Sequence, residues 1–222
     1  MSLFVVATPI GHPQDFSQRA LETLRTAELI IGEELKVLRQ TLKTAGVQGI
    51  PLDQLNEHSR PNDIAHFVEE CRTKRVALVS DCGTPGFCDP GADLVAACHE
   101  AKVQVTPIPG VSSLMTLLSV SGVRLEQFLF YGFLPAKAEL RQRAITELKK
   151  ERRPFIILET PYRAQQLIDD VQKHFAQAHC VVGLNLTGEN ERVVRVKGRE
   201  LNNHGPFKDL EPIVLVVPTL NA

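Results

Sequence analysis

A segment rich in glycine and proline, Ser80-Asp81-Cys82-Gly83-Thr84-Pro85-Gly86, has the composition of a ligand-binding loop. It follows a short apolar run at residues 76–79 and precedes a helical pattern at residues 92–98. This order places the segment at the carboxyl end of a strand, where open α/β sheets bind their ligands. Glycines there let a ligand approach the main chain closely, and prolines stiffen the loop. We therefore expect this loop to hold a small molecule.

One aspartate lies within this glycine-rich segment and another follows it. Asp81 and Asp89 could each accept a hydrogen bond from a ribose hydroxyl or an amine. Asp89 is followed by Pro90, which equally suits a helix N-cap with proline in the first turn. Both interpretations of Asp89 stay open, and the cap is favoured.

Four other turn-rich segments also follow apolar runs: Thr8–Gly11, Pro109–Ser113, Phe133–Pro135 and Glu159–Arg163. Carboxyl ends of parallel strands face one crevice, so loops at such ends can converge on one small-molecule site. Any single segment could merely be a strand that ends in glycine and proline. Five together favour a binding site.

Several other kinds of site are disfavoured by the sequence. It contains no GxGxxG, GxxxxGK[ST] or GxSxG motif, which argues against a nicotinamide site, a P-loop or a hydrolase elbow. The seven histidines do not have the spacing of metal ligands, and we expect no metal. Five cysteines without CxxC spacing argue against a disulfide framework and favour the reducing cytoplasm.

Strands and helices alternate through the first half of the chain, which predicts a parallel α/β sheet in a domain spanning residues 1–110. The expected strands lie at 3–7, 29–31, 48–52, 75–80 and 103–108. Helical periodicity covers 16–29, 33–44, 61–72 and 92–98.

The pattern changes in the second half, residues 111–222, where we expect a mixed α/β domain. Strands are predicted at 128–134, 155–159, 180–186, 191–197 and 212–218, with a hairpin turn at Thr187–Asn190. Helices are predicted at 112–121, 136–150 and 162–175.

Charge is nearly balanced overall, with a formal net charge of −1. Residues 1–111 carry 10 Lys/Arg and 14 Asp/Glu, whereas residues 112–222 carry 15 and 12. The densest basic cluster comprises Arg141, Arg143, Lys149, Lys150, Arg152 and Arg153. It is either a solvated helix face or a nucleic-acid contact. No apolar run has the length of a membrane span, and the amino terminus resembles a first strand rather than a signal peptide.

The ordered motifs resemble those of a known family. They are Ala7–Gly11, Ser80–Gly86, Asp89–Gly91, Ile108–Gly110, Gly132–Pro135 and Glu159–Arg163, and they extend over nearly the whole chain. Together they resemble the tetrapyrrole methylase superfamily, and most closely its ribosomal RNA small-subunit cytidine 2′-O-methyltransferase branch.

This resemblance implies a two-domain α/β fold with S-adenosylmethionine (SAM) in the cleft between the domains. It also implies a homodimer that acts on ribosomal RNA of the small subunit, with the target nucleotide near Thr8–Gly11. The implied cofactor contacts are Pro9, Ser80, Asp81, Cys82, Gly83, Thr84, Pro85, Gly86, Pro109, Gly110, Ser112, Ser113, Phe133, Leu134 and Pro135.

Catalysis of such a transfer needs alignment of the reacting atoms more than covalent help. A ribose hydroxyl is a poor nucleophile, so a general base or a charge that stabilises the alkoxide would help. The candidates are Glu33, Glu34, Glu57, His58, Glu159 and Arg163. Among them, Glu33 closely follows a strand, and we rank it with Arg163 as the leading catalytic candidates.

The chain departs from the branch in several segments. Gly32–Val37 lacks the acidic-Asp-Thr-Arg sequence, Tyr162 replaces a histidine, and Leu184–Gly188 replaces an Arg-Glu-Leu-Thr-Lys run. The sequence also lacks the small helical segment that usually follows the last strand. These changes leave two alternatives open: a methyltransferase for a tetrapyrrole or other small-molecule acceptor, and a non-catalytic SAM-binding regulator.

Overall fold

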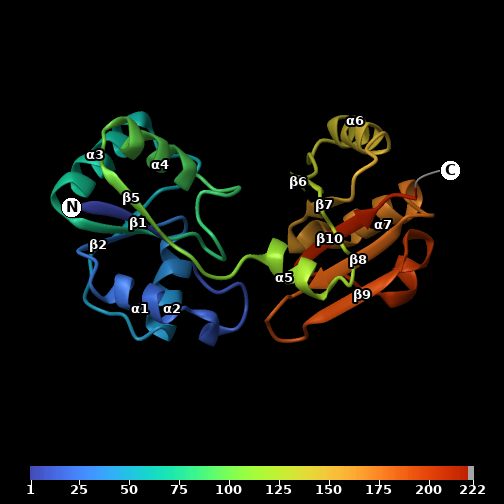
Figure 1. Cartoon of the computed structure of the whole chain (residues 1–222), viewed down its shortest axis with the longest axis horizontal. Helices are drawn as coiled ribbons and strands as arrows, with labels where there is room; N and C mark the ends of the chain where they lie inside the picture. Colours follow the sequence, from blue (N-terminus) through green and yellow to red (C-terminus); the bar gives the residue numbers. More distant parts are fainter. Residues whose placement is uncertain (220–222) are drawn as a thin grey trace. The chain divides into compact units, whose positions relative to one another are not determined.

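The computed structural model describes residues 1–219, which divide into two compact units. The first unit is Met1–Ser112, and the second begins at Ser113. Each has its own five-stranded sheet and its own hydrophobic core (Figure 1).

The first unit contains the parallel sheet that the alternating pattern predicts. Its strands are β1 (Ser2–Val6), β2 (Leu29–Gly32), β3 (Leu52–Gln54), β4 (Arg75–Leu78) and β5 (Gln104–Ile108), in the order β3-β2-β4-β1-β5. All four strand pairs are parallel. Val5 pairs with Leu78, and Val6 pairs with Ile108, so the carboxyl ends of β1, β4 and β5 lie at one edge.

Helices cover both faces of this sheet (Figure 1). On one face, α1 (Gln18–Arg25) and α2 (Leu35–Thr44) bury Leu24 and Leu38 against Ile30. On the other, α3 (Pro61–Thr73) and α4 (Gly91–Glu100) bury Phe67 and Leu94 in a second cluster. Coverage of both faces explains why the strands are continuous apolar runs rather than alternating ones.

Two predicted elements of the first unit differ from the observed ones. The third strand was expected at 48–52 but occupies Leu52–Gln54, because Val47 is buried beneath α2 and Gly49 has a φ of +77°. The first helix is shorter than 16–29. The Ser17 side chain caps α1 by accepting a hydrogen bond from the Ala20 N–H at 3.0 Å, and a short 3-10 turn, η1 (Pro13–Asp15), precedes it.

The second unit has the expected mixed sheet. Its strands are β6 (Leu129–Phe133), β7 (Phe155–Leu158), β8 (His179–Leu184), β9 (Arg192–Lys197) and β10 (Pro212–Val217), in the order β6-β7-β10-β8-β9. The β6–β7 pair is parallel and the other pairs are antiparallel, which includes the predicted β8–β9 hairpin.

Helices α5 (Ser113–Val120), α6 (Ala138–Leu148) and α7 (Ala164–His174) accompany this sheet, with 3-10 segments η2 (Pro161–Arg163) and η3 (Gly198–His204). Its core includes Ile145 of α6, Leu167 of α7 and the fully buried Phe155 and Phe207. Among the residues described, no helix is both long and apolar enough to cross a bilayer.

Candidate functional site

Thr8, directly after β1, holds the glycine-rich loop in place. Its backbone N–H donates to the carbonyl of Gly83 at 2.8 Å, and its hydroxyl donates to the carbonyl of Ser80 at 3.3 Å. Thr8 is buried, so these bonds form away from bulk water. The end of β1 and the loop after β4 are therefore one structural unit.

The same loop is also tied to the ends of β2 and β5. The Asp81 carboxylate accepts a hydrogen bond from the Glu34 N–H at 3.1 Å, and the Thr84 hydroxyl donates to the Val111 carbonyl at 3.1 Å. The structure thus brings together three predicted groups at one sheet edge: Ser80–Gly86, the residues around Glu33, and Pro109–Gly110.

Close packing of these loops requires two of the glycines. Gly83 has a φ of +78°, and a Cβ there would lie 3.2 Å from Cγ2 of Ile10. A Cβ at Gly110 would lie 2.9 Å from the Cβ of Ala7. Gly86 also has a positive φ, of +79°, but a Cβ there would meet open space. Contacts between loops are therefore one reason for glycine at 83 and 110.

Asp89 organises the end of the glycine-rich loop just before α4. Its carboxylate accepts hydrogen bonds from the N–H groups of Gly86 at 3.0 Å, Phe87 at 3.2 Å and Gly91 at 2.8 Å. Pro90 is the N-cap residue of α4, so Asp89 lies one position before the predicted cap. Its hydrogen bonds still fix the path of the loop into the helix.

The edge of the first sheet is acidic. Burial raises the pKa of Glu33, and the nearby carboxylates of Asp81, Asp89 and Glu57 raise it further. Burial also raises the pKa of Asp81, although the hydrogen bond from the Glu34 N–H opposes this shift. A cationic ligand at this edge would relieve the repulsion between these carboxylates.

The accessible part of the loop is suited to hold SAM. Ser80, Gly83 and Pro85 are buried, whereas Cys82, Thr84 and Gly86 are exposed, as are Pro109 and Gly110. The exposed segments present main-chain donors and acceptors, and the carboxylates beside them complement a sulfonium and an ammonium group. The residues present therefore fit this cofactor.

In the second unit, Arg163 belongs to a buried network of charges. Its Nη2 lies 2.6 Å from Oε1 of Glu159, whose side chain has no exposed surface. Arg141 lies on the other side of Glu159, with Nη1 2.9 Å from Oε2, and its Nε lies 2.6 Å from the Asp170 carboxylate. The two positive charges of the arginines thus neutralise the two negative charges of the carboxylates.

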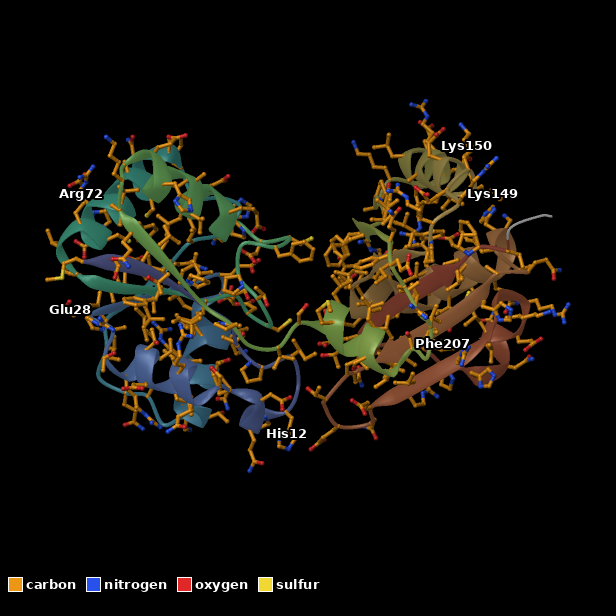
Figure 2. The ribbon with its side chains drawn as sticks, in the orientation of Figure 1. His12, Glu28, Arg72, Lys149, Lys150 and Phe207 are labelled. Atoms are coloured by element: carbon orange, nitrogen blue, oxygen red, sulfur yellow. The ribbon has the colours of Figure 1, made fainter. Side chains whose placement is uncertain are left out.

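The position of Arg141 corrects its assignment to the predicted basic cluster, whose other five members are exposed. Arg141 is only 3% exposed, because α6 turns it toward β7 rather than toward solvent. Lys150 and Arg153 are exposed but paired with Glu147 and Glu151. In the described chain, the remaining members have no ion-pair partner: Arg143, Lys149 and Arg152. Figure 2 shows Lys149 and Lys150 directed outward from the end of α6.

Other predicted residues of the second unit lie at one edge of its sheet. Phe133 pairs with Leu158 at the ends of β6 and β7, so the segments Phe133–Pro135 and Glu159–Arg163 are neighbours. Phe133 is exposed, but the side chain of Leu134 is buried in the core. Leu134 could therefore contact a ligand only through its main chain. Ser113 begins α5 and is half-buried.

The altered 184–188 segment is held by its own hydrogen bonds. Asn185 Oδ1 accepts from the Glu211 N–H at 2.9 Å, and the carboxylate of Glu191 accepts from the Thr187 N–H. Asn185, Thr187 and Asn190 all have positive φ angles. Leu184 ends β8, and the rest of the segment lies in the seven-residue connection between β8 and β9.

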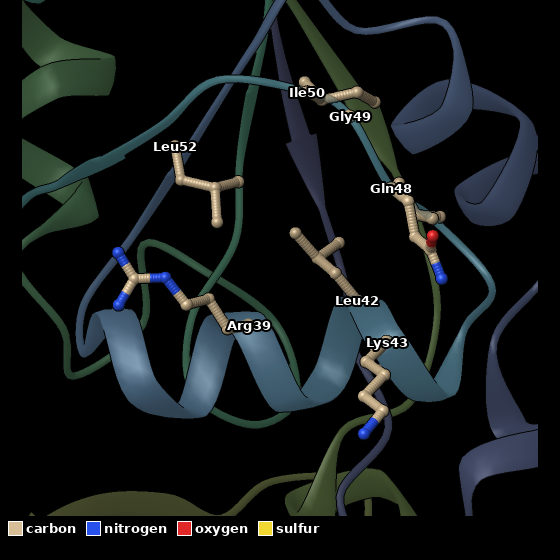
Figure 3. Close-up of a pocket in the computed structure, with 8 residues that line it drawn as sticks. Arg39, Leu42, Lys43, Gln48, Gly49, Ile50 and Leu52 are labelled. Carbon is tan, nitrogen blue, oxygen red and sulfur yellow. The ribbon is translucent and has the colours of Figure 1, made fainter.

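A hollow of about 330 Å³ lies between α2 and residues 47–52 (Figure 3). Leu42 and Val47 form its buried part. Leu52 is the first residue of β3, so this hollow lies at the amino end of that strand, away from the loop edge. No group of three or more potential metal ligands occurs among residues 1–219.

Comparison with known proteins identifies relatives over most of the sequence. A protein of Synechocystis sp. named ribosomal RNA small subunit methyltransferase I is 37% identical over 195 residues, which are 87% of this chain and 70% of the relative. A protein of that name from Haemophilus influenzae is 36% identical and is covered to 64%, so the chain spans less than two thirds of it. A third, from Leptospira biflexa, is 32% identical over 92% of this chain and 85% of its own length.

Solved structures share the fold. A diphthine synthase superposes with a TM-score of 0.77, at 15% identity over 98% of this chain and 90% of its own. A cobalt precorrin-4 methyltransferase of cobalamin biosynthesis gives 0.68, at 16% identity over 97% and 94%. Residues 2–202 match the family described as Tetrapyrrole (Corrin/Porphyrin) Methylases. The resemblance seen in the sequence motifs is thereby confirmed, and the chain belongs to the tetrapyrrole methylase family.

Proposed function

We propose that this chain transfers a methyl group from SAM to a ribose 2′-hydroxyl of small-subunit ribosomal RNA. Relatives that are 32–37% identical are named ribosomal RNA small subunit methyltransferase I. The structural observation that carries the proposal is the joined loop edge of the first unit. There Thr8, Asp81 and Thr84 fasten the ends of four strands around an accessible acidic segment.

The cofactor is proposed to bind along the glycine-rich loop. When bound, SAM supplies an activated methyl group on a positively charged sulfur. The carboxylate of Asp81 would attract this charge, and the exposed main chain around Thr84 and Gly110 would hydrogen-bond the polar ends. The proposed contacts are those that the resemblance implies, Pro9, Ser80–Gly86, Pro109, Gly110, Ser112, Ser113 and Phe133–Pro135, with Leu134 acting through its backbone.

Glu33 is proposed as the general base that accepts the proton of the ribose hydroxyl. Its raised pKa makes its carboxylate a stronger base than that of an ordinary glutamate. A general base is most effective when its pKa lies near the working pH, so this shift favours proton transfer. The neighbouring carboxylates of Asp81 and Asp89 contribute to this property by repulsion.

Arg163 is proposed to stabilise negative charge on the substrate. Its bond to Glu159 orients the guanidinium, and its side chain is 17% exposed, which leaves part of it accessible. A planar guanidinium with several donors suits an oxyanion or a phosphate.

Two further features belong to the proposal: a homodimer, and residence in the reducing cytoplasm. Exposed apolar side chains on the second unit, such as Met115 and Val120 of α5, would favour association with another copy. The five cysteines are free thiols, as a reducing compartment would keep them. Sedimentation analysis that finds only monomers across the working concentration range would contradict the dimer.

Conservative substitutions test the proposed chemistry. Glu33→Gln should reduce methyl transfer to small ribosomal subunits by about 100-fold or more while SAM affinity, measured by calorimetry, stays within a few-fold. Glu34→Gln is the matched control, because it changes the adjacent carboxylate but keeps an oxygen that can accept from the Lys36 N–H. Equal activity of the two variants would rule out Glu33 as the base.

A further inference from the structure

A second hollow in the first unit lies between α2 and the segment that follows β1. Its volume is about 210 Å³. Its lining residues come from these two elements: Pro9, Gly11, Pro13, Phe16, Gln40, Thr41 and Thr44. The three α2 residues lie on one side of the helix, because positions 40, 41 and 44 are close on a helical surface.

The volume of this hollow suits one flat ring system. It equals the space of about seven water molecules, at roughly 30 Å³ each. Pockets for larger organic ligands start at roughly 300 Å³. The hollow is thus too small for a whole cofactor and large enough for one nucleobase.

Its lining combines apolar surfaces with hydrogen-bonding groups. Phe16 is half-buried and packs against the core beneath α1 and α2, so its ring is held in place. Gln40 is exposed and Thr41 is half-buried, and neither the amide nor the hydroxyl has a hydrogen-bond partner within residues 1–219, so both are accessible to a ligand. The Thr44 hydroxyl, in contrast, donates to the Gln40 carbonyl at 3.0 Å. An amide that offers a donor beside an acceptor matches the edge of a base.

Ile10 lies in the chain between two residues that line this hollow, and its side chain contacts the glycine-rich loop. Pro9 and Gly11 line the hollow, and the side chain of Ile10 between them lies against Gly83. A ligand in the hollow would therefore lie beside the loop at which SAM is proposed to bind.

The helix that forms one wall of the hollow is basic. Lys36, Arg39 and Lys43 are exposed on α2, which contains no acidic residue, and none has a carboxylate partner in the described part of the chain. Figure 3 shows the Lys43 side chain pointing away from the side of α2 that carries Leu42. Arg39 and Lys43 line the other hollow, beside residues 47–52, so they can contact phosphates of a strand that crosses α2 but not the base in this hollow.

We propose that this hollow binds one unstacked nucleobase of the RNA substrate, with the Gln40 amide and the Thr41 hydroxyl on the base edge and Phe16 and the prolines against its face. The inference rests on the proposed function for the identity of the ligand. Enzymes that act on individual nucleotides hold unstacked bases in this way, by hydrogen bonds to the edge and apolar contacts to the face.

Photochemical cross-linking tests the location without requiring methyl transfer. The probe is a single-stranded oligoribonucleotide with 5-iodocytidine or 5-iodouridine at one position, irradiated with the full chain and digested for mass spectrometry. Cross-links to residues 9–16 or 35–44 that are lost in Gln40→Glu support the proposal. Cross-links confined to other segments, or no cross-link at all, overturn it.

Affinity for the same oligoribonucleotide tests the polar contacts. Gln40→Glu removes the amide donors without changing size, and Thr41→Val removes only the hydroxyl. Each should weaken binding by about 5- to 150-fold, which is the range for a base-edge contact. Gln48→Glu is the matched control, because it adds the same charge at a residue that lines the other hollow. Its loss of affinity measures the effect of the added charge alone, and Gln40→Glu should lose more.

Equal affinities of Gln40→Glu and Gln48→Glu would overturn the inference even if the wild-type chain methylates small subunits. Conversely, a mapped cross-link with no methyl transfer to ribosomal RNA by the wild-type chain would contradict the proposed function and leave the base site standing.

Discussion

Arg141 and Glu159 form a buried ion pair, with Nη1 of the arginine 2.9 Å from Oε2 of the glutamate. Glu159 also holds Arg163 at 2.6 Å, so the two arginines share one carboxylate that has no contact with solvent. The pair joins α6 to the end of β7. Arg141 is therefore a buried support for the candidate catalytic residue Arg163 rather than a member of a surface cluster.

Removal of Arg141 should therefore destabilise the second unit strongly. Arg141→Met leaves the buried carboxylate of Glu159 with one partner fewer, and the expected loss is about 3–5 kcal/mol of unfolding free energy. Urea denaturation followed by circular dichroism measures it. Arg143→Met, two residues further along α6 and exposed, should cost no more than about 0.5 kcal/mol. Similar losses for both variants would show that the Arg141 pair does not stabilise the fold.

The acid limb of the pH–rate profile should move when Asp81 is neutralised. Glu33 must be ionised to accept a proton, so kcat/KM should rise with pH through its raised pKa. Asp81 contributes to that raised pKa by repulsion, so Asp81→Asn should lower it and shift the limb to lower pH. The asparagine can still accept from the Glu34 N–H. Rates measured at saturating SAM check this, and a limb that stays in place or moves to higher pH excludes Glu33 as its source.

Glu33→Gln should make the folded protein more stable at neutral pH while it removes activity. A carboxyl group with a raised folded-state pKa opposes folding when it is ionised. The gain should be present above that pKa and should disappear as the pH falls below the pKa of the unfolded chain. Thermal unfolding at neutral and at acidic pH measures the difference. A variant that is less stable at neutral pH would indicate a structural role for Glu33.

Gly83 and Gly86 have nearly equal φ angles, so substituting each one distinguishes the cost of backbone strain from the cost of disturbed packing. Gly83→Ala and Gly86→Ala each add a Cβ at a left-handed position, which costs about 1–2 kcal/mol. Only Gly83→Ala also pushes a Cβ against Ile10. We expect it to lose more stability and more SAM affinity than Gly86→Ala, as measured by denaturation and calorimetry. The reverse order would contradict the packing of the three loops.

Charge reversal at the unpaired cations near the end of α6 should weaken RNA binding. Arg143→Glu combined with Lys149→Glu removes positive charges that have no carboxylate partner, so the salt dependence of binding to small subunits should become shallower. The slope of log K against log salt should fall by about 0.7–0.9 for each lost phosphate contact. An unchanged slope would place the RNA contacts elsewhere on the protein.

Much of the fold could be predicted because its signals are local. Apolar runs followed by Gly and Pro correctly indicated nine of the ten strands that the structure describes, within a residue or two at each end. The third strand could not be placed, because Val47 and Ile50 are apolar for a different reason: they fill space beside α2. Nothing in a short run of sequence distinguishes packing beneath a helix from pairing in a sheet.

The candidate site was predictable in its loops but not in its connections. The five turn-rich segments were visible, and three of them converge in the first unit. The Thr8 hydroxyl donates hydrogen bonds to Ser80 and Gly83, which lie more than seventy residues away in the sequence, and no local pattern reveals such contacts. The same applies to Arg141, whose helix could have presented it to solvent as readily as to Glu159. The polar side chains of Gln40, Thr41 and Thr44 have the pattern of an ordinary exposed helix face, so the sequence does not distinguish them as the wall of a hollow.

The most direct test of the proposed function is transfer of labelled methyl from SAM to small ribosomal subunits isolated from cells that lack this protein. Free RNA and reactions without substrate serve as controls, and SAM binding is measured on the same sample. Label in the RNA, located by nucleoside analysis on a ribose 2′-oxygen, is the predicted result. Absence of label from the RNA while SAM binds normally would contradict it.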